Sequence, residues 1–153
     1  LTWPWADARR WDLGKGELYT LRLRVEGEGW SDDYAQSFGF REFWIEGRDF
    51  YLNGTPIRLR PTLSGSSADW AKWQKMGVNF FEVWPSGTEG RGRDFELWTN
   101  LFTEADRQGV LLNGVAPDMG WMGTQIERPA QLKKYREAAE RIIRRDRNHP
   151  SII

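Results

Sequence analysis

A regular alternation of short apolar runs with longer amphipathic segments, across the C-terminal half, is the feature that most constrains the fold of this chain. The apolar, β-prone runs are "VNFFEVW" (78–84), "VLLNGVA" (110–116) and "SII" (151–153). Each run follows a segment whose apolar residues recur at helical spacing. Strands that are apolar on both faces and alternate with helices are typical of a parallel sheet covered by helices. The sequence therefore predicts an α/β fold.

Glycine and proline mark the limits of the three predicted helices. Trp70 and Trp73 lie on one face of the first helix, which Gly77 ends at a C′ position. Gly109 ends the second helix in the same way, and Pro129 fits the first turn of the third. These signals separate the helices from the apolar runs between them.

The N-terminal third is predicted to be β structure after an irregular opening segment. "LYTLRLRV" (18–25) alternates strictly between apolar and polar residues, which predicts a strand with one face in solvent and the other buried. The aromatic run "SFGFREFWI" (37–45) is also β-prone. Asn53-Gly54 lies between two apolar runs and predicts a hairpin, because both turn positions need a positive φ.

Two α/β architectures fit this order of elements. An open doubly wound sheet would carry a glycine-rich phosphate loop after its first strand, which we predict at residues 57–60. The loop that follows, "PTLSGSS" (61–67), matches neither G-x-G-x-x-G nor a P-loop. A (β/α)8 barrel fits better, with three complete βα units and the start of a fourth strand. We therefore predict the last strands of a β-sandwich at 1–45 and the N-terminal part of a TIM barrel at 46–153.

Charge and composition exclude several classes of function. Lys plus Arg and Asp plus Glu both number 22, so a net charge of zero gives no general attraction to nucleic acid or to an anionic membrane. No apolar run approaches the roughly 20 residues that span a bilayer, and charged residues interrupt any signal-like opening segment. The absence of cysteine excludes disulfides and cysteine-ligated metals. Localisation stays open, and a secreted or periplasmic parent protein is compatible with the sequence.

Six motifs follow one another along nearly the whole chain. They are "WDLGKGELYTLRLRV" (11–25), "FGFRE" (38–42), "FYLNGTPIRLR" (50–60), "KMGVNFFEVW" (75–84), "EADRQGVLL" (104–112) and "RDRNHPSII" (145–153). In this order they resemble glycoside hydrolase family 2, the group of β-galactosidases, β-glucuronidases and β-mannosidases. The first two motifs resemble the end of that family's immunoglobulin-like sandwich and its junction with the catalytic barrel. The other four resemble the hairpin and the first strands of the barrel.

The resemblance implies retaining hydrolysis of β-linked sugars by two glutamates, one the acid/base and the other the nucleophile. That chemistry places the two carboxyl groups about 5 Å apart across the anomeric carbon. In the family the acid/base follows an asparagine at the end of the fourth barrel strand, and the nucleophile lies on a later strand. Both glutamates are therefore expected beyond Ile153. We predict no catalytic residue and no cofactor within the chain, which is expected to be inactive as it stands.

Two positions depart from the family pattern. The family has an arginine at the end of the second barrel strand, where this chain has Glu82. The family's first strand leads into an Arg-Gly segment with a nearby histidine, whereas Arg60 is followed here by Pro61-Thr62-Leu63. Both positions lie where the family holds its substrate. The departures motivate a second hypothesis, a non-catalytic carbohydrate-binding or scaffold relative.

The candidate substrate-binding residues are those predicted at the ends of the second and third barrel strands and in the loops that follow, because active sites of such barrels lie there. They are Glu82, Trp84, Asp118 and Trp121. Glu82 could bind sugar hydroxyls or act as a carboxylate catalyst, and it could instead pair with Arg60 or Arg91. For Asp118 the alternative to substrate binding is a structural role, in the loop or as a helix cap.

The chain has 10 tryptophans, and their positions in the predicted elements separate candidates for sugar binding from candidates for the core. Trp84 ends the second predicted barrel strand and Trp121 lies in the loop after the third, so both suit stacking on a sugar ring, with burial as the alternative. Trp70, Trp73 and Trp98 lie on predicted helical faces and are expected in the core.

The remaining polar signals favour structure over binding. His149 is the only histidine, so a metal site is not expected, and we predict that it holds the turn from the third helix into the fourth strand. The arginines of "RIIRRDR" (141–147) lie on an amphipathic helix and need no nucleic acid. The expected partner is a carbohydrate, bound through the parent protein. A sheet of three units also leaves an edge open to self-association.

Overall fold

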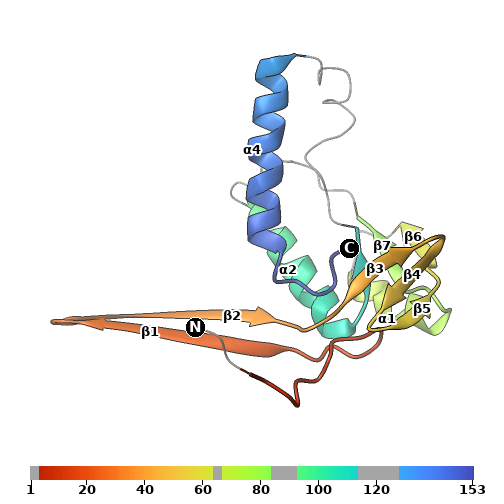
Figure 1. Ribbon diagram of the computed structural model, residues 1–153, viewed down its shortest axis with the longest axis horizontal. Coiled ribbons are helices and arrows are strands. Elements are labelled where there is room, and N and C mark those ends of the chain that lie inside the picture. Colours follow the sequence, from red (N-terminus) through yellow and green to blue (C-terminus); the bar gives the residue numbers. More distant parts are fainter. Residues whose placement is uncertain (1–3, 64–66, 84–92, 114–127) are drawn as a thin grey trace.

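The computed structural model describes residues 4–63, 67–83, 93–113 and 128–153. Its strands are β1 (Tyr19–Gly27), β2 (Trp30–Phe38), β3 (Phe43–Glu46), β4 (Asp49–Leu52), β5 (Thr55–Ile57), β6 (Pro61–Leu63), β7 (Phe80–Glu82) and β8 (Leu111–Leu112). Its helices are the 3-10 turn η1 (Ser67–Asp69), α1 (Trp70–Lys75), α2 (Arg93–Gln108) and α4 (Pro129–Asp146). Within these ranges the strands form three sheets (Figure 1). No helix in the described ranges is long and apolar enough to cross a membrane.

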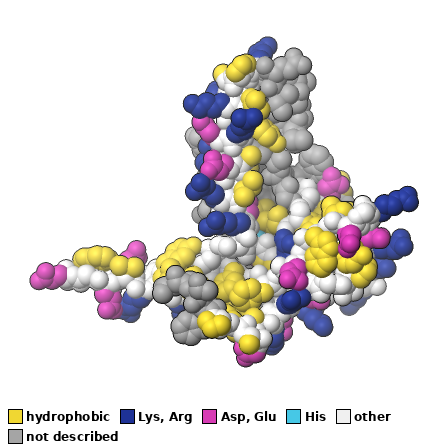
Figure 2. Space-filling view, viewed as in Figure 1, with side chains coloured by type: hydrophobic (Ala, Val, Ile, Leu, Met, Phe, Trp, Pro, Cys, Tyr) yellow, Lys and Arg dark blue, Asp and Glu magenta, His cyan; other side chains and the backbone are white. Residues whose placement is uncertain are grey.

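β1 and β2 form a long antiparallel hairpin that projects away from the rest of the molecule (Figure 1). The alternation in "LYTLRLRV" correctly predicted a strand, but the prediction of a buried face was wrong. Leu21, Leu23 and Val25 are 46%, 48% and 55% exposed, and Figure 2 shows hydrophobic side chains in the open along the hairpin. The physical reason is that the hairpin is a sheet of its own, and none of the other described strands pairs with it.

The second sheet is antiparallel, in the order β3-β4-β5. Asn53 and Gly54 turn the chain between β4 and β5 with φ values of 52° and 84°, which confirms the predicted hairpin. Across the β3–β4 pair, Trp44 stacks on Tyr51 with ring centroids 5.2 Å apart. The Asn53 side chain also donates to the Trp11 carbonyl oxygen at 2.8 Å, which ties the turn to the N-terminal segment.

The third sheet is parallel, in the order β6-β7-β8. The predicted first strand at 57–60 is wrong by several residues. Ile57 ends β5, and the first parallel strand is Pro61–Leu63, which lies in the predicted loop. Pro61 is tolerated in a strand here because it is the first residue of β6, and β6 is an edge strand among the described ones.

Residues 151–153 add a fourth parallel segment beside β8, as predicted for "SII". The Leu112 N–H donates to the backbone carbonyl oxygen of Ser151 at 2.9 Å, and the Leu112 carbonyl oxygen accepts from the Ile153 N–H at 3.0 Å. Ile152 forms the parallel bridge to Leu112. The parallel segments therefore follow one another in chain order, with α1, α2 and α4 in the connections between them.

The helix limits follow the local signals in the sequence. Gly77 and Gly109 have φ values of 89° and 65° and lie just after α1 and α2, as predicted. Pro129 occupies the first turn of α4, where its missing N–H costs no hydrogen bond.

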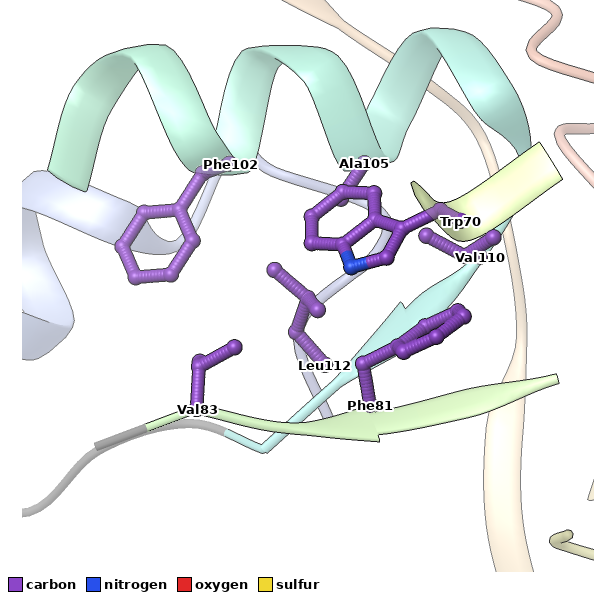
Figure 3. Packing of buried hydrophobic residues seen from close by; sticks show 7 residues of the cluster. All are labelled: Trp70, Phe81, Val83, Phe102, Ala105, Val110 and Leu112. Carbon is purple, nitrogen blue, oxygen red and sulfur yellow. The ribbon is translucent and has the colours of Figure 1, made fainter. Parts of the chain in front are cut away.

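One face of the parallel sheet packs on α1 and α2 through a hydrophobic core (Figure 3). The buried members of this helical-side core are Trp70, Phe81, Val83, Phe102, Ala105, Val110 and Leu112. Trp70 stacks on Phe81 with ring centroids 5.1 Å apart, and Trp73 packs against the core. The expectation for these two helical tryptophans is confirmed, whereas the side chain of Trp98 lies outside the described part.

A second core, built on Trp11, Leu52 and Leu111, joins the parallel sheet to the β3-β4-β5 sheet and to the N-terminal segment. Trp11 is fully buried although the opening segment was predicted to be irregular, and its Nε1 donates to the Asp106 carbonyl oxygen at 2.7 Å. Nearby, a Cβ on Gly109 would lie 2.5 Å from the Lys15 nitrogen, so the close approach of these segments also requires glycine there.

Candidate functional site at the C-terminal edge of the parallel sheet

The C-terminal edge of the parallel sheet brings together the ends of four segments. Leu63 pairs with Glu82 in register, and Leu112 lies between Phe81 on β7 and Ile152 on the fourth segment. Because parallel strands run in one direction, the residues that end them meet at one edge of the sheet. This edge is the candidate site.

Glu82 is the last residue of β7 and is partly exposed. Its neighbours Phe81 and Val83 are buried in the helical-side core. Because successive side chains of a strand point to opposite faces, Glu82 lies on the other face, which it shares with Phe80. The predicted candidate therefore lies at the end of its strand and faces away from α1 and α2.

The alternative role for Glu82, an ion pair with Arg60, is wrong. Arg60 precedes β6 at the opposite end of the sheet, where its guanidinium donates to the Gly77 oxygen at 3.3 Å. Its backbone N–H donates to Asn79 Oδ1 at 2.8 Å. Among the described residues, no hydrogen bond or ion pair engages the Glu82 carboxylate. Arg91, the other candidate partner, lies outside the described residues.

Asn113 was missed as a site residue and bridges the ends of two strands. Its Oδ1 accepts from the Val83 N–H at 2.8 Å, and its Nδ2 donates to the Val83 oxygen at 3.3 Å. The predicted strand at 110–116 in fact ends at Leu112, and the Asn113 side chain continues the pairing for one more residue. An asparagine directly after a buried apolar run was the available signal in the sequence.

Three of the four predicted substrate-binding residues, Trp84, Asp118 and Trp121, lie outside the described residues, so their roles stay predictions. Glu82 is thus the predicted candidate that can be placed at the edge. Within the described ranges, no group of three His, Asp or Glu side chains is arranged to hold a metal ion.

A buried polar cluster lies where the chain passes from α4 into the fourth parallel segment. Asp106, from the last turns of α2, is 3% exposed. Its Oδ2 lies 2.6 Å from His149 Nδ1, and its Oδ1 accepts from the Ser151 N–H at 3.0 Å and the Ser151 hydroxyl at 2.6 Å. The contact is the structural role predicted for His149. Because an ionised carboxylate only accepts hydrogen bonds, Nδ1 carries the proton in this pair.

Arg41, which lies between β2 and β3, binds the same segment. Its Nε donates to the Pro150 oxygen at 2.6 Å, and its terminal nitrogen donates to the Ile152 oxygen. Burial lowers the pKa of Arg41 below its ordinary value, and the nearby Asp106 carboxylate opposes this by raising it. Arg41 and Asp106 were both missed. Asp106 follows the buried Phe102 by four residues, a helical-stripe signal, and Arg41 lies in the motif "FGFRE" (38–42), which was interpreted only as the junction before the barrel.

No protein-family model matches the chain. The chain is 26% identical over 153 residues to a beta-galactosidase from Thermoanaerobacterium thermosulfurigenes and 25% identical over 166 residues to a beta-glucuronidase from Sus scrofa. These alignments cover 96% and 100% of the chain but only 21% and 24% of the relatives. The chain therefore spans less than a quarter of the length of these two relatives.

Solved structures of β-glucuronidases match the fold of this chain. A β-glucuronidase from Ruminococcus gnavus in complex with an N1-substituted uronic isofagomine matches with a TM-score of 0.73 and 25% identity, covering 97% of this chain and 26% of that one. The β-glucuronidase of Lactobacillus rhamnosus matches with a TM-score of 0.66 and 26% identity, covering 95% and 27%. The predicted resemblance to the β-galactosidase and β-glucuronidase group of glycoside hydrolase family 2 is thus confirmed, as is a mixed sheet-and-helix fold of the β-glucuronidase kind.

Proposed function

We propose, from this resemblance to glycoside hydrolase family 2, that the chain is part of a longer glycoside hydrolase that cleaves β-linked sugars with retention of configuration. The observation that carries the proposal is the share of the chain that aligns with glycosidases. Alignments with a beta-galactosidase and a beta-glucuronidase extend over 96% and 100% of the chain. Both relatives are named as glycosidases, so a carbohydrate is the proposed substrate class of the longer protein.

The proposed parent fold is an immunoglobulin-like sandwich followed by a (β/α)8 barrel, with residues 1–45 in the sandwich and 46–153 in the barrel. The exposed apolar face of the β1–β2 hairpin supports the first part, because further strands of a sandwich would cover such a face. The parallel order β6-β7-β8 with helices in the connections supports the second. The proposed boundary falls within β3, and the contacts of Trp11 and Arg41 cross it.

Hydrolysis would be carried out by two glutamates outside residues 1–153. The acid/base would follow Ile153 at the C-terminal end of the fourth parallel segment, which pairs with β8. In this proposal Glu82 accepts hydrogen bonds from sugar hydroxyls at the same edge, because its carboxylate has no partner among the described residues. Trp84 and Trp121 would stack on sugar rings, and Asp118 would bind hydroxyls.

The test uses the full-length polypeptide that contains these residues and, beside it, the 153-residue chain alone. Nitrophenyl β-glycosides of glucuronic acid, galactose and mannose are assayed, and NMR identifies the anomer that is released first. We expect the full-length protein to hydrolyse at least one glycoside with retention, and the 153-residue chain to hydrolyse none. Turnover by the short chain, or no turnover by the long one, would contradict the proposal.

Glu82→Gln in the full-length protein tests the proposed binding role. A raised KM with a smaller change in kcat is expected, because the amide keeps the shape but loses the charged acceptor. Glu46→Gln on the exposed end of β3 is the matched control, and its kinetic constants should equal those of the wild type. If both variants behave alike, Glu82 has no role in binding the sugar.

A non-catalytic carbohydrate-binding or scaffold relative is the second candidate. Glu82 in place of the family arginine favours it. An Asn-Glu pair within about ten residues after Ile153, the expected acid/base, would favour the enzyme. Calorimetric binding of a saccharide by a full-length protein that lacks turnover would favour the binding relative.

The 153-residue chain by itself is also proposed to self-associate. The edge strand β6 and the apolar face of the β1–β2 hairpin are both uncovered among the described residues. Unpaired strand edges and exposed apolar faces favour pairing between chains.

A further inference from the structure

We propose that Arg41 is a positioning residue for the acid/base of the proposed glycosidase, because it holds the fourth parallel segment in place beside β8. The inference rests on the proposed function. It concerns a side chain that lies 109 residues before the Pro150 carbonyl to which it donates. Arg41 is therefore outside the barrel part as proposed, yet it contacts the strand that would carry the catalytic acid.

The contacts of Arg41 span the beginning of the segment. Its guanidinium donates to the carbonyl oxygens of Pro150 and Ile152, which flank Ser151. A guanidinium is a planar fork of fixed geometry, so two such hydrogen bonds fix the distance and the angle between the two carbonyl groups. A lysine ammonium is a single point of attachment and cannot impose that relationship.

Asp106 holds the same segment from the side of α2. Its carboxylate accepts the N–H and the hydroxyl of Ser151 and contacts His149 Nδ1. Donors of the segment therefore bind Asp106 while its acceptors bind Arg41. The two groups carry opposite charges, and each offsets part of the cost of burying the other. We call Arg41, Asp106, His149 and Ser151 the strand clamp.

The strand clamp sets the course of the chain just before the proposed catalytic carboxyl. The Ile152 carbonyl binds Arg41, and the next N–H, that of Ile153, donates to the Leu112 oxygen at 3.0 Å. A strand advances about 3.3 Å per residue, so a carboxyl a few residues farther on inherits the direction set here. An error of about 1 Å in a catalytic group can cost about a hundredfold in rate.

A displaced general acid has a kinetic signature that a general loss of stability does not have. Cleavage of an alkyl β-glycoside needs protonation of the leaving oxygen, whereas dinitrophenolate departs without it. Loss of Arg41 should therefore lower kcat/KM for the alkyl glycoside at least about tenfold more than for the dinitrophenyl glycoside. A variant that only unfolds more easily would lose both activities in the same proportion.

The experiment compares full-length wild type, Arg41→Met, Arg41→Lys and the control Arg22→Met, which changes an exposed arginine of β1. Both glycosides are assayed, and hydrogen exchange is followed at the Leu112 and Ile153 amides. We expect Arg41→Met to show the selective kinetic loss and at least about tenfold faster exchange at these amides. Arg41→Lys should lie between Arg41→Met and wild type, and Arg22→Met should match wild type.

The outcomes separate the inference from the proposed function. Equal losses on the two glycosides, or unchanged exchange at Leu112 and Ile153, would overturn the positioning role of Arg41. If Arg41→Met does not fold, Arg41→Lys supplies the same comparison. A wild-type protein without activity on any glycoside overturns the proposed function, and the positioning role with it.

Discussion

Nδ1 of His149 lies 2.6 Å from Oδ2 of Asp106, and this contact joins the end of α2 to the segment that follows α4. The two side chains are 13% and 4% exposed. Since the other carboxylate oxygen accepts two hydrogen bonds from Ser151, both oxygens of the buried group are satisfied. The pair is thus a tertiary link between parts of the chain 43 residues apart.

Replacement of the carboxylate should be costly. Asp106→Asn keeps the shape but turns one acceptor into a donor, which then faces the donors of His149 or Ser151. We expect a loss of about 2–4 kcal/mol in the free energy of unfolding, because a buried network loses one charged partner. Urea denaturation measures the loss, with the exposed Asp32→Asn in β2 as the control. Equal stabilities of the two variants would refute the structural importance of the pair.

Trp11 should contribute more to stability than its place in an irregular segment indicates. Trp11→Phe removes the donor to the Asp106 carbonyl and leaves a small cavity in a fully buried site. The expected destabilisation is about 1–3 kcal/mol, measured by chemical denaturation. Trp30→Phe is the control, because Trp30 is 58% exposed. A loss no larger than that of the control would show that the Trp11 contact is dispensable.

Gly109→Ala and Gly29→Ala separate backbone strain from close contact. Both glycines have positive φ, 65° and 77°, so alanine should cost about 1–2 kcal/mol at either position. A Cβ on Gly109 would also lie 2.5 Å from the Lys15 nitrogen, whereas Gly29 has open space. Thermal unfolding should therefore show a clearly larger loss for Gly109→Ala. Equal losses would mean that the opening segment moves aside without cost.

Asn113 is expected to hold the ends of β7 and β8 together. Asn113→Ala removes both hydrogen bonds to the Val83 backbone and should cost about 1–3 kcal/mol if those groups stay buried. Hydrogen exchange at the Val83 amide should become faster at the same time. Asn100→Ala, at an exposed position of α2, should leave that amide unchanged. Unchanged exchange in both variants would argue against the bridge.

The exposed face of the hairpin should drive association of the 153-residue chain. Sedimentation velocity at increasing concentration is expected to show oligomers that the double variant Leu21→Lys, Leu23→Lys reduces, because it places charges on the apolar face. Thr20→Lys, on the opposite face of β1, is the control. A wild-type chain that stays monomeric at high concentration would contradict the proposed self-association.

Features encoded by neighbouring residues were predictable from the sequence. Asn53-Gly54 turns a hairpin, Gly77 and Gly109 end helices, and Pro129 begins one. Each signal is a backbone preference of one or two residues. The first parallel strand was misplaced because residues 57–63 contain two short β-prone stretches, and only pairing with β7 decides between them.

For the candidate site, the sequence predicted Glu82 at a strand end, because strand, loop and helix alternate around it. Asn113 was missed because its role depends on the backbone of Val83, which directly follows β7 and is 30 residues away in the sequence. The roles of Trp84, Asp118 and Trp121 stay predictions.

The sequence by itself determined the alternation of strands and helices and most of their approximate positions, though not that of the first parallel strand. The order of its motifs determined the family that the chain resembles. Only the tertiary structure decided that Trp11 is buried, that Leu21 and its neighbours are exposed, and that Arg41 and Asp106 meet the segment before Ile153. The physical reason is distance along the chain. Periodicity reports the preferences of residues within one or two turns, whereas burial depends on which distant element covers a face. Arg41 and the Pro150 carbonyl, 109 residues apart, become neighbours only through the fold.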